Sequence, residues 1–167
     1  MPLYQIFNGP SPTTAAQAVV TTGTAIKTLL QVKGVTSVLV KIIEWGISFD
    51  GAAAAAGIKC ELLETGTVFA TVTAHVAAGI VKFGDPNAPT STVYFSVGTA
   101  ATGYTATAEG TITASRVFDA QLVQPTNQYV KQFPLGREPV VNADSALRIR
   151  VTAQAAVNAY CYVTVEV

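Results

Sequence analysis

The sequence predicts an all-β protein with one antiparallel β-sandwich domain, and three observations support this class. Apolar residues recur with a period of two along most of the chain after residue 24, which is the spacing of strands. Glycine, proline and Asp-Gly turn signals separate these runs, and no segment shows convincing helical spacing. A chain of 167 residues also suits a single domain.

Residues 1–23 form the first element, which we expect to be an extended N-terminal arm. They contain Pro2, Pro10 and Pro12 and show little alternation, except for one short strand expected at residues 4–7. The sandwich is therefore expected to occupy residues 24–167 and to fold without the arm.

The first half of the sandwich is expected to contain three strands. Residues 26–32 form the first run, and residues 37–49 form the longest, in which a predicted core face carries the residues Leu39, Ile43, Trp45, Ile47 and Phe49. Asp50-Gly51 ends that run, and we expect the tract Ala52–Ala56 to be a loop, because five residues between two glycines are too short for a stable helix. Residues 58–62 form the third strand.

The middle of the chain gives weaker signals. Residues 68–81 alternate but also fit helical spacing, and their many β-branched residues favour a strand or an extended loop. A surface turn is expected at residues 84–89 and a short strand at 93–97. The next strand is expected to bury a face with the residues Ile112, Ala114, Phe118, Ala120 and Leu122, and residues 129–133 continue in a further run.

The last two runs alternate most clearly, at residues 147–151 and 157–165, and predict an antiparallel hairpin. Arg148 and Arg150 share the polar face of the first run, and Tyr160 and Tyr162 share the polar face of the second. Arginine and aromatic residues are enriched at the centres of protein interfaces, so these four residues are the predicted subunit contacts. A solvated sheet face is the alternative interpretation.

Eight or more short strands in a chain of this length favour a jelly roll over an immunoglobulin-like sandwich, which needs only about 100 residues. Both cysteines, Cys60 and Cys161, fall on predicted apolar faces. We therefore expect them to be buried, reduced thiols, with a disulfide between them as the alternative.

Charge and hydropathy limit the classes of function. Only 12% of the residues are charged, compared with roughly 25% in an average soluble chain. The formal net charge is zero, which argues against binding to nucleic acid or to an anionic membrane. No apolar run of about 18 residues and no signal-peptide pattern occurs, so we expect synthesis in a cytoplasm. A charge-poor surface also predicts a homo-oligomer, most simply a trimer.

Catalytic and metal-binding motifs are not evident. His75 is the sole histidine and has no ligand-type neighbours, and no serine lies in a G-x-S-x-G motif. We therefore expect a non-enzymatic protein without a cofactor or metal. A hydrolase remains the alternative if several of the acidic residues Asp50, Glu61, Glu64, Asp85, Asp119 and Asp144 converge in one pocket.

Three stretches of the sequence resemble a group of small virion structural proteins of tailed bacteriophages. They are residues 44–51 (EWGISFDG), residues 59–67 (KCELLETGT) and residues 147–153 (LRIRVTA), within a similarity that extends from about residue 24 to the end of the chain. The resemblance implies a capsid decoration or minor capsid protein, a trimeric jelly roll that reinforces the shell of the particle. Its implied partners are further copies of itself and the major capsid protein.

Two further functions stay open at this point. The same resemblance is compatible with a tail, collar or fibre component of the virion. A carbohydrate-binding module would instead need an exposed aromatic platform, for which the candidates are Tyr94, Tyr104, Tyr129, Tyr160 and Tyr162.

Overall fold

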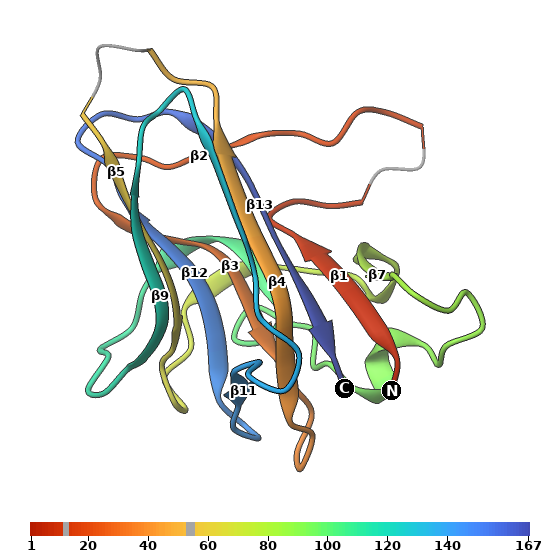
Figure 1. The fold of residues 1–167 in the computed structure, drawn as a ribbon. Helices are drawn as coiled ribbons and strands as arrows, with labels where there is room; N and C mark the ends of the chain where they lie inside the picture. Colours follow the sequence, from red (N-terminus) through yellow and green to blue (C-terminus); the bar gives the residue numbers. More distant parts are fainter. Residues whose placement is uncertain (12–13, 53–55) are drawn as a thin grey trace.

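The computed structural model describes residues 1–11, 14–52 and 56–167, and they form two antiparallel β-sheets packed face to face (Figure 1). The prediction of an all-β antiparallel sandwich is confirmed. The jelly-roll connectivity stays a prediction. The expected loop at Ala52–Ala56 falls largely on residues 53–55, which lie outside the described residues.

The first sheet, here called sheet A, has a five-strand path with two short additions. The path is β10 (Gln128–Gln132), β4 (Val40–Phe49), β13 (Asn158–Glu166), β1 (Leu3–Phe7) and β7 (Ile80–Lys82). The short strand β11 (Val140–Val141) pairs with β4, and β2 (Val20–Thr21) pairs with β13.

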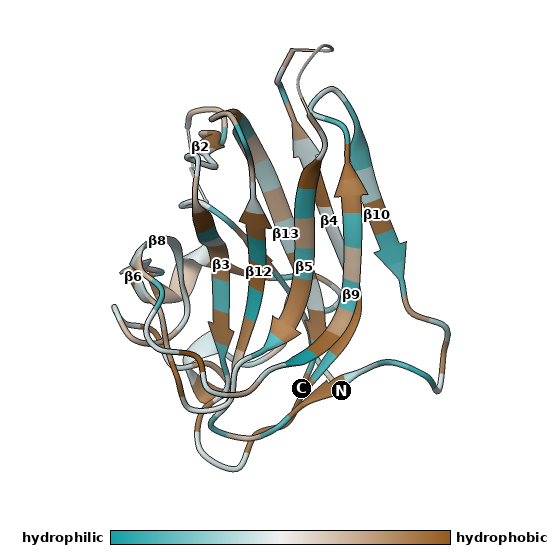
Figure 2. Ribbon diagram, turned by 90° about the vertical axis from the view of Figure 1, so that its left-hand side faces the viewer, coloured by the Kyte–Doolittle hydropathy of each residue, from teal (hydrophilic) through white to brown (hydrophobic). Residues whose placement is uncertain are grey.

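The second sheet, sheet B, faces the viewer in Figure 2. Its order is β6 (Thr71–Ala74), β8 (Gly103–Ala108), β3 (Ile26–Lys33), β12 (Ala146–Thr152), β5 (Ile58–Glu64) and β9 (Arg116–Val123). Two short 3-10 turns, at Ala77–Gly79 and Ser91–Val93, flank β7 in the sequence. The strand expected at residues 93–97 does not form: Val93 ends the latter turn, and Phe95 and Val97 make only isolated β-bridges.

The core lies between the sheets and is built from alternate residues of the long strands, as the period of two predicts. Trp45, Tyr4 and Phe95 are the largest apolar side chains buried in it. Cys60 on β5 and Cys161 on β13 are both buried, free thiols. This confirms that they lie on the inner faces.

The predicted hairpin at the C-terminus is wrong, because its two strands belong to different sheets. β12 pairs with β3 and β5 in sheet B, whereas β13 pairs with β4 and β1 in sheet A. Residues 153–157 therefore cross from one sheet to the other. Alternation describes each strand's two faces but not its neighbours, so it does not distinguish a hairpin from a connection between layers.

The expected N-terminal arm is corrected in a similar way. Residues 4–7 are a strand as predicted, but β1 lies inside sheet A, between β13 and β7, and buries Tyr4 and Ile6 completely. Residues 9–11 and 14–19 project from the body instead (Figure 1). The ends of this loop lie close together, since a Cβ on Gly9 would be 3.5 Å from the Ala18 carbonyl oxygen. Pro12 lies outside the described residues.

Two predicted strand faces also change. The core face of β4 switches at Ile43, where a bulge against β13 brings Ile42 and Trp45 to the same side, and Leu39 is exposed. In β9 the expected apolar face is reversed at its end: Leu122 is 71% exposed, while Asp119 is buried. The reversal coincides with a bulge at Phe118 in the pairing of β9 with β5. Asp119 then faces polar partners on the opposite sheet, described below.

Candidate interaction surfaces

The four predicted subunit-contact residues do not share one surface. Arg148 and Arg150 lie on β12 in sheet B, and Tyr160 and Tyr162 lie on β13 in sheet A. Arg148 is fully buried within its own chain, so its side chain does not reach the surface.

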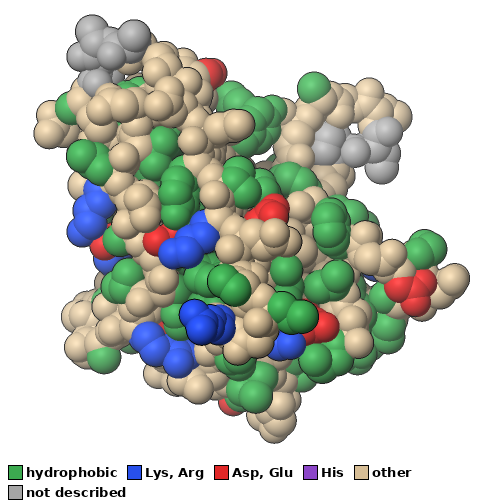
Figure 3. All heavy atoms as spheres, in the orientation of Figure 1, with side chains coloured by type: hydrophobic (Ala, Val, Ile, Leu, Met, Phe, Trp, Pro, Cys, Tyr) green, Lys and Arg blue, Asp and Glu red, His purple; other side chains and the backbone are tan. Residues whose placement is uncertain are grey.

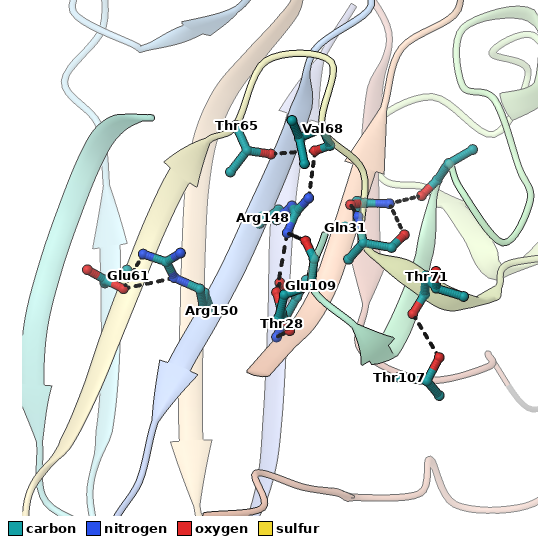
Figure 4. A network of polar contacts seen from close by, with 12 residues as sticks. Thr28, Gln31, Glu61, Thr65, Val68, Thr71, Thr107, Glu109, Arg148 and Arg150 are labelled. Atoms are coloured by element: carbon teal, nitrogen blue, oxygen red, sulfur yellow. Dashed lines mark hydrogen bonds and ion pairs between the residues drawn. The ribbon is translucent and has the colours of Figure 1, made fainter. Parts of the chain in front are cut away.

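Arg148 is covered by two segments that cross the outer face of sheet B (Figure 4). Its guanidinium donates to the carbonyl oxygens of Val68 at 2.6 Å and Glu109 at 2.9 Å, and it lies 3.2 Å from Glu109 Oε2. The same carboxylate accepts hydrogen bonds of 2.6 Å from the amide and the hydroxyl of Thr28. Arg148 therefore fastens these segments to the sheet, which is a structural role.

Arg150 is partly buried and pairs with Glu61, which also lies 2.9 Å from Lys59 Nζ (Figure 4). Burial alone would raise the pKa of Glu61, but the hydrogen bonds and charges of Lys59 and Arg150 lower it below its usual value. Glu64 is likewise held by Arg116. These carboxylates are paired ions and do not share a pocket with Asp50, Asp85 or Asp144, which lie in or beside separate turns.

Asp119 is a buried carboxylate, although alternation with Phe118 and Ala120 predicts that it lies on the exposed face of its strand. It projects from β9 toward sheet A, where Trp45 Nε1 donates to it at 3.1 Å, the Tyr129 hydroxyl at 2.9 Å and Lys131 Nζ at 3.1 Å. These contacts join β9 to β4 and β10, at the side of the sandwich where both sheets end. The cluster is an inter-sheet connection with all three donors satisfied.

His75 is buried and its Nε2 donates to the Phe7 carbonyl oxygen at 2.8 Å. Burial lowers its pKa, against a smaller opposite effect of the hydrogen bond to Phe7, which favours the neutral imidazole. Its ring also packs edge-on against Tyr104, with 4.9 Å between the centroids. His75 thus supports the start of the loop after β1.

The outer face of sheet A carries an ordered pattern of side chains, in three rows across the strands. The central row runs Val130, Gly46, Tyr162 and Phe7 on β10, β4, β13 and β1. A neutral polar row on one side contains Gln128, Ser48 and Tyr160. The row on the other side contains Gln132, Glu44, Thr164 and Gln5.

A cavity of about 220 Å³ lies over Gly46 in this face, and we call it the Gly46 groove. Its lining comes from the central row, the neutral row, two strand neighbours and the projecting loop: Phe7, Gln17, Gly46, Ile47, Ser48, Gln128, Val130, Tyr160, Cys161 and Tyr162. The Tyr160 hydroxyl donates to the Gln17 carbonyl oxygen, which ties the loop to the groove wall. The Tyr162 hydroxyl donates to Glu44 Oε1 at 2.5 Å.

A second surface lies around β7 and the two 3-10 turns, and we call it the β7 corner. Four large apolar side chains of this segment are exposed: Val76 (67%), Val81 (37%), Phe83 (56%) and Val93 (52%). A hollow of about 540 Å³ lies in the same segment, and of these four residues only Val81 lines it. Its other apolar lining residues are Ala77, Ala78, Ile80 and Pro86. Exposed apolar clusters of this kind mark interaction sites.

The side of the sandwich where β9 and β10 run, seen in Figure 3, has scattered hydrophobic side chains between Lys and Arg. Among the described residues, no group of three or more His, Cys, Asp or Glu side chains is placed to hold a metal ion. The same residues include no helix with the length and hydropathy of a membrane span.

Comparison of the chain with protein-family models, with curated proteins and with solved structures finds no match in any of the three. The interpretation of its function therefore depends on the sequence and on the geometry described above.

Proposed function

We propose that this chain is a non-enzymatic structural protein of a bacteriophage particle, a homo-oligomer that attaches to the capsid and reinforces it. The observation that carries the proposal is the β7 corner. Val81 lies on β7, an edge strand of only three residues, and Val76, Phe83 and Val93 lie on the segments that flank this strand in the sequence. A second copy of the chain would cover both these side chains and the strand edge.

The arrangement of charged groups supports a structural role. Glu61, Glu64 and Asp119 are each held by a basic partner, and the buried Arg148 fastens two crossing segments to its sheet. Such paired groups stabilise one geometry instead of offering a reactive acid or base.

The proposal of a phage particle depends on the resemblance of the three sequence stretches to virion structural proteins of tailed bacteriophages. In the structure they fall on β4, β5 and β12, with the turns that follow them. β5 and β12 are direct neighbours in sheet B. The resemblance therefore concerns the architecture of the sandwich, and the proposed partners are further copies of the chain and the major capsid protein.

Gold-labelled antibody against this chain, applied to purified particles of the phage that encodes it, tests the proposal. We expect label over the head. Label confined to the tail would assign the chain to a tail, collar or fibre, whereas particles that contain none of the chain by mass spectrometry would contradict a virion role.

A further inference from the structure

We propose that the Gly46 groove binds a neutral carbohydrate, with one sugar ring lying against Tyr162. This inference goes beyond the proposed structural role and does not depend on it. It follows from the position of one aromatic ring, the polar rows beside it and the shape of the sheet beneath.

The ring of Tyr162 forms a flat platform on the outer face of sheet A. A Cβ on Gly46 would lie 2.6 Å from Cε1 of Tyr162, so the tyrosine ring lies directly over the backbone of β4 and needs a glycine there. The hydroxyl of Tyr162 is held by Glu44, and its ring packs 5.9 Å from that of Phe7. The ring is thus fixed against the sheet, and the apolar C–H face of a sugar can pack on an aromatic face presented in this way.

Polar side chains beside Tyr162 can donate and accept hydrogen bonds. Gln128 and Ser48 lie in the row next to Tyr162, and neither side chain makes a hydrogen bond to another described residue. Nε2 of Gln17 is buried beside Gly9, so it offers no donor to the groove. Amide and hydroxyl groups both donate and accept, which matches the hydroxyl groups of a sugar.

The groove carries no charged side chain in its lining. None of the residues that line the groove is Asp, Glu, Lys or Arg. Glu44, in the next row, already accepts the hydrogen bond of Tyr162. A charged ligand would lose its hydration here without gaining a counter-ion, so the ligand class is neutral.

The backbone beneath the groove favours a sugar over a peptide strand as the ligand. β4 and β13 are paired on both sides, β4 with β10 and β13, and β13 with β4 and β1. Their backbone groups are therefore engaged in the sheet, and an added strand would find no edge beneath the groove. The volume is also below the range of about 300–1,000 Å³ that is usual for drug-sized ligands, which fits a single sugar unit.

The test is an amide NMR titration of the full chain with maltose, cellobiose, lactose and N,N′-diacetylchitobiose, each up to about 20 mM. We expect at least one disaccharide to shift the amide signals of Gly46, Gln128 and Tyr162. Gln128→Ala should weaken that binding at least fivefold. Gln132→Ala is the matched control, an exposed glutamine on the same side of β10 but outside the groove, and should leave Kd within twofold.

Gly46→Ala provides a second test, because the added methyl group displaces the Tyr162 ring. This variant should weaken disaccharide binding at least tenfold. Amide signals away from the groove should stay unchanged, which shows that the fold is retained. The proposal is overturned if no disaccharide shifts these signals, or if binding survives both Gln128→Ala and Gly46→Ala. It is also overturned if Val130→Lys converts the protein to monomers, since the groove face would then be a contact between copies. An oligomer that binds no sugar would leave the structural role intact.

Discussion

Trp45 Nε1 on β4 donates a hydrogen bond of 3.1 Å to Oδ2 of Asp119, across the two layers of the sandwich. The same oxygen accepts the hydroxyl of Tyr129 at 2.9 Å, and Lys131 reaches the other oxygen. One carboxylate thus accepts hydrogen bonds from three donors of sheet A. The contact lies at the side of the sandwich where β9 and β10 are the edge strands of their sheets.

Replacement of this carboxylate should destabilise the fold. Asp119→Ala leaves the indole N–H and the Tyr129 hydroxyl without their acceptor, so we expect a loss of about 2–4 kcal/mol in the free energy of unfolding. Urea denaturation measures the change. Asp85→Ala is the control, because Asp85 lies in an exposed turn, and should cost less than about 1 kcal/mol. Equal losses in the free energy of unfolding for both variants would contradict a stabilising role of the Asp119 contacts.

The Asp119 cluster also predicts an acid dependence of stability. Burial would raise the pKa of Asp119, but the hydrogen bonds from Tyr129, Lys131 and Gln121 outweigh it and lower the pKa below its usual value. A folded-state pKa below the unfolded one stabilises the protein above the unfolded value, and this contribution is lost as pH falls below about 4. Thermal unfolding from pH 7 to pH 2 should show this loss. In Asp119→Asn the loss of stability between pH 7 and pH 2 should be smaller. An unchanged loss would show that the acid dependence does not come from Asp119.

The thiols should react slowly in the native protein. Burial, with a smaller effect of Glu61, raises the pKa of Cys60 to about 12, and burial raises the pKa of Cys161 well above its usual value. Neither sulfur is then a thiolate at neutral pH, and neither is accessible. Labelling with a thiol reagent should be slow until denaturant is added. Rapid labelling of native protein would show that the inner faces are assigned incorrectly.

Removal of β1 should unfold the sandwich, in contrast to the expectation for a separate arm. Deletion of residues 1–8 exposes the partners of Tyr4 and Ile6 and removes Asn8, which donates to the Ala159 carbonyl oxygen and accepts from the Cys161 amide. Circular dichroism should show loss of cooperative unfolding. Replacement of residues 10–18 by a short glycine linker is the control, because the loop ends lie close together, and it should stay folded. A folded 1–8 deletion would contradict the placement of β1.

Much of the fold follows from the sequence because a period of two identifies strands and their inner faces directly. Trp45, Cys60 and Cys161 are buried on the faces that alternation predicts. Alternation contains no information about which strands are neighbours, so it misplaced the connection between β12 and β13. It also placed Arg148 at the surface, because the segments that cover this residue come from distant parts of the chain.

The candidate surfaces were predictable only in part. Tyr160 and Tyr162 belong to the Gly46 groove, and both were identified from the polar face of one strand. Gly46 and Gln128 were missed, since their proximity to Tyr162 arises from the register of β10, β4 and β13. Sequence patterning does not predict the β7 corner, because its valines alternate with other residues as they would in a strand. In the structure, only Ile80–Lys82 in that part of the chain pairs in sheet A.

Sedimentation equilibrium of the full chain at micromolar concentrations tests the central claim, self-association through the β7 corner, most directly. The account predicts a mass three times the 17.3 kDa of one chain, and dissociation when Phe83→Lys and Val93→Lys are combined, since both side chains are exposed and the double variant should remain folded. Leu122→Lys replaces a still more exposed side chain, on β9, and should leave the assembly intact. A wild-type mass of one chain at tens of micromolar would contradict the account.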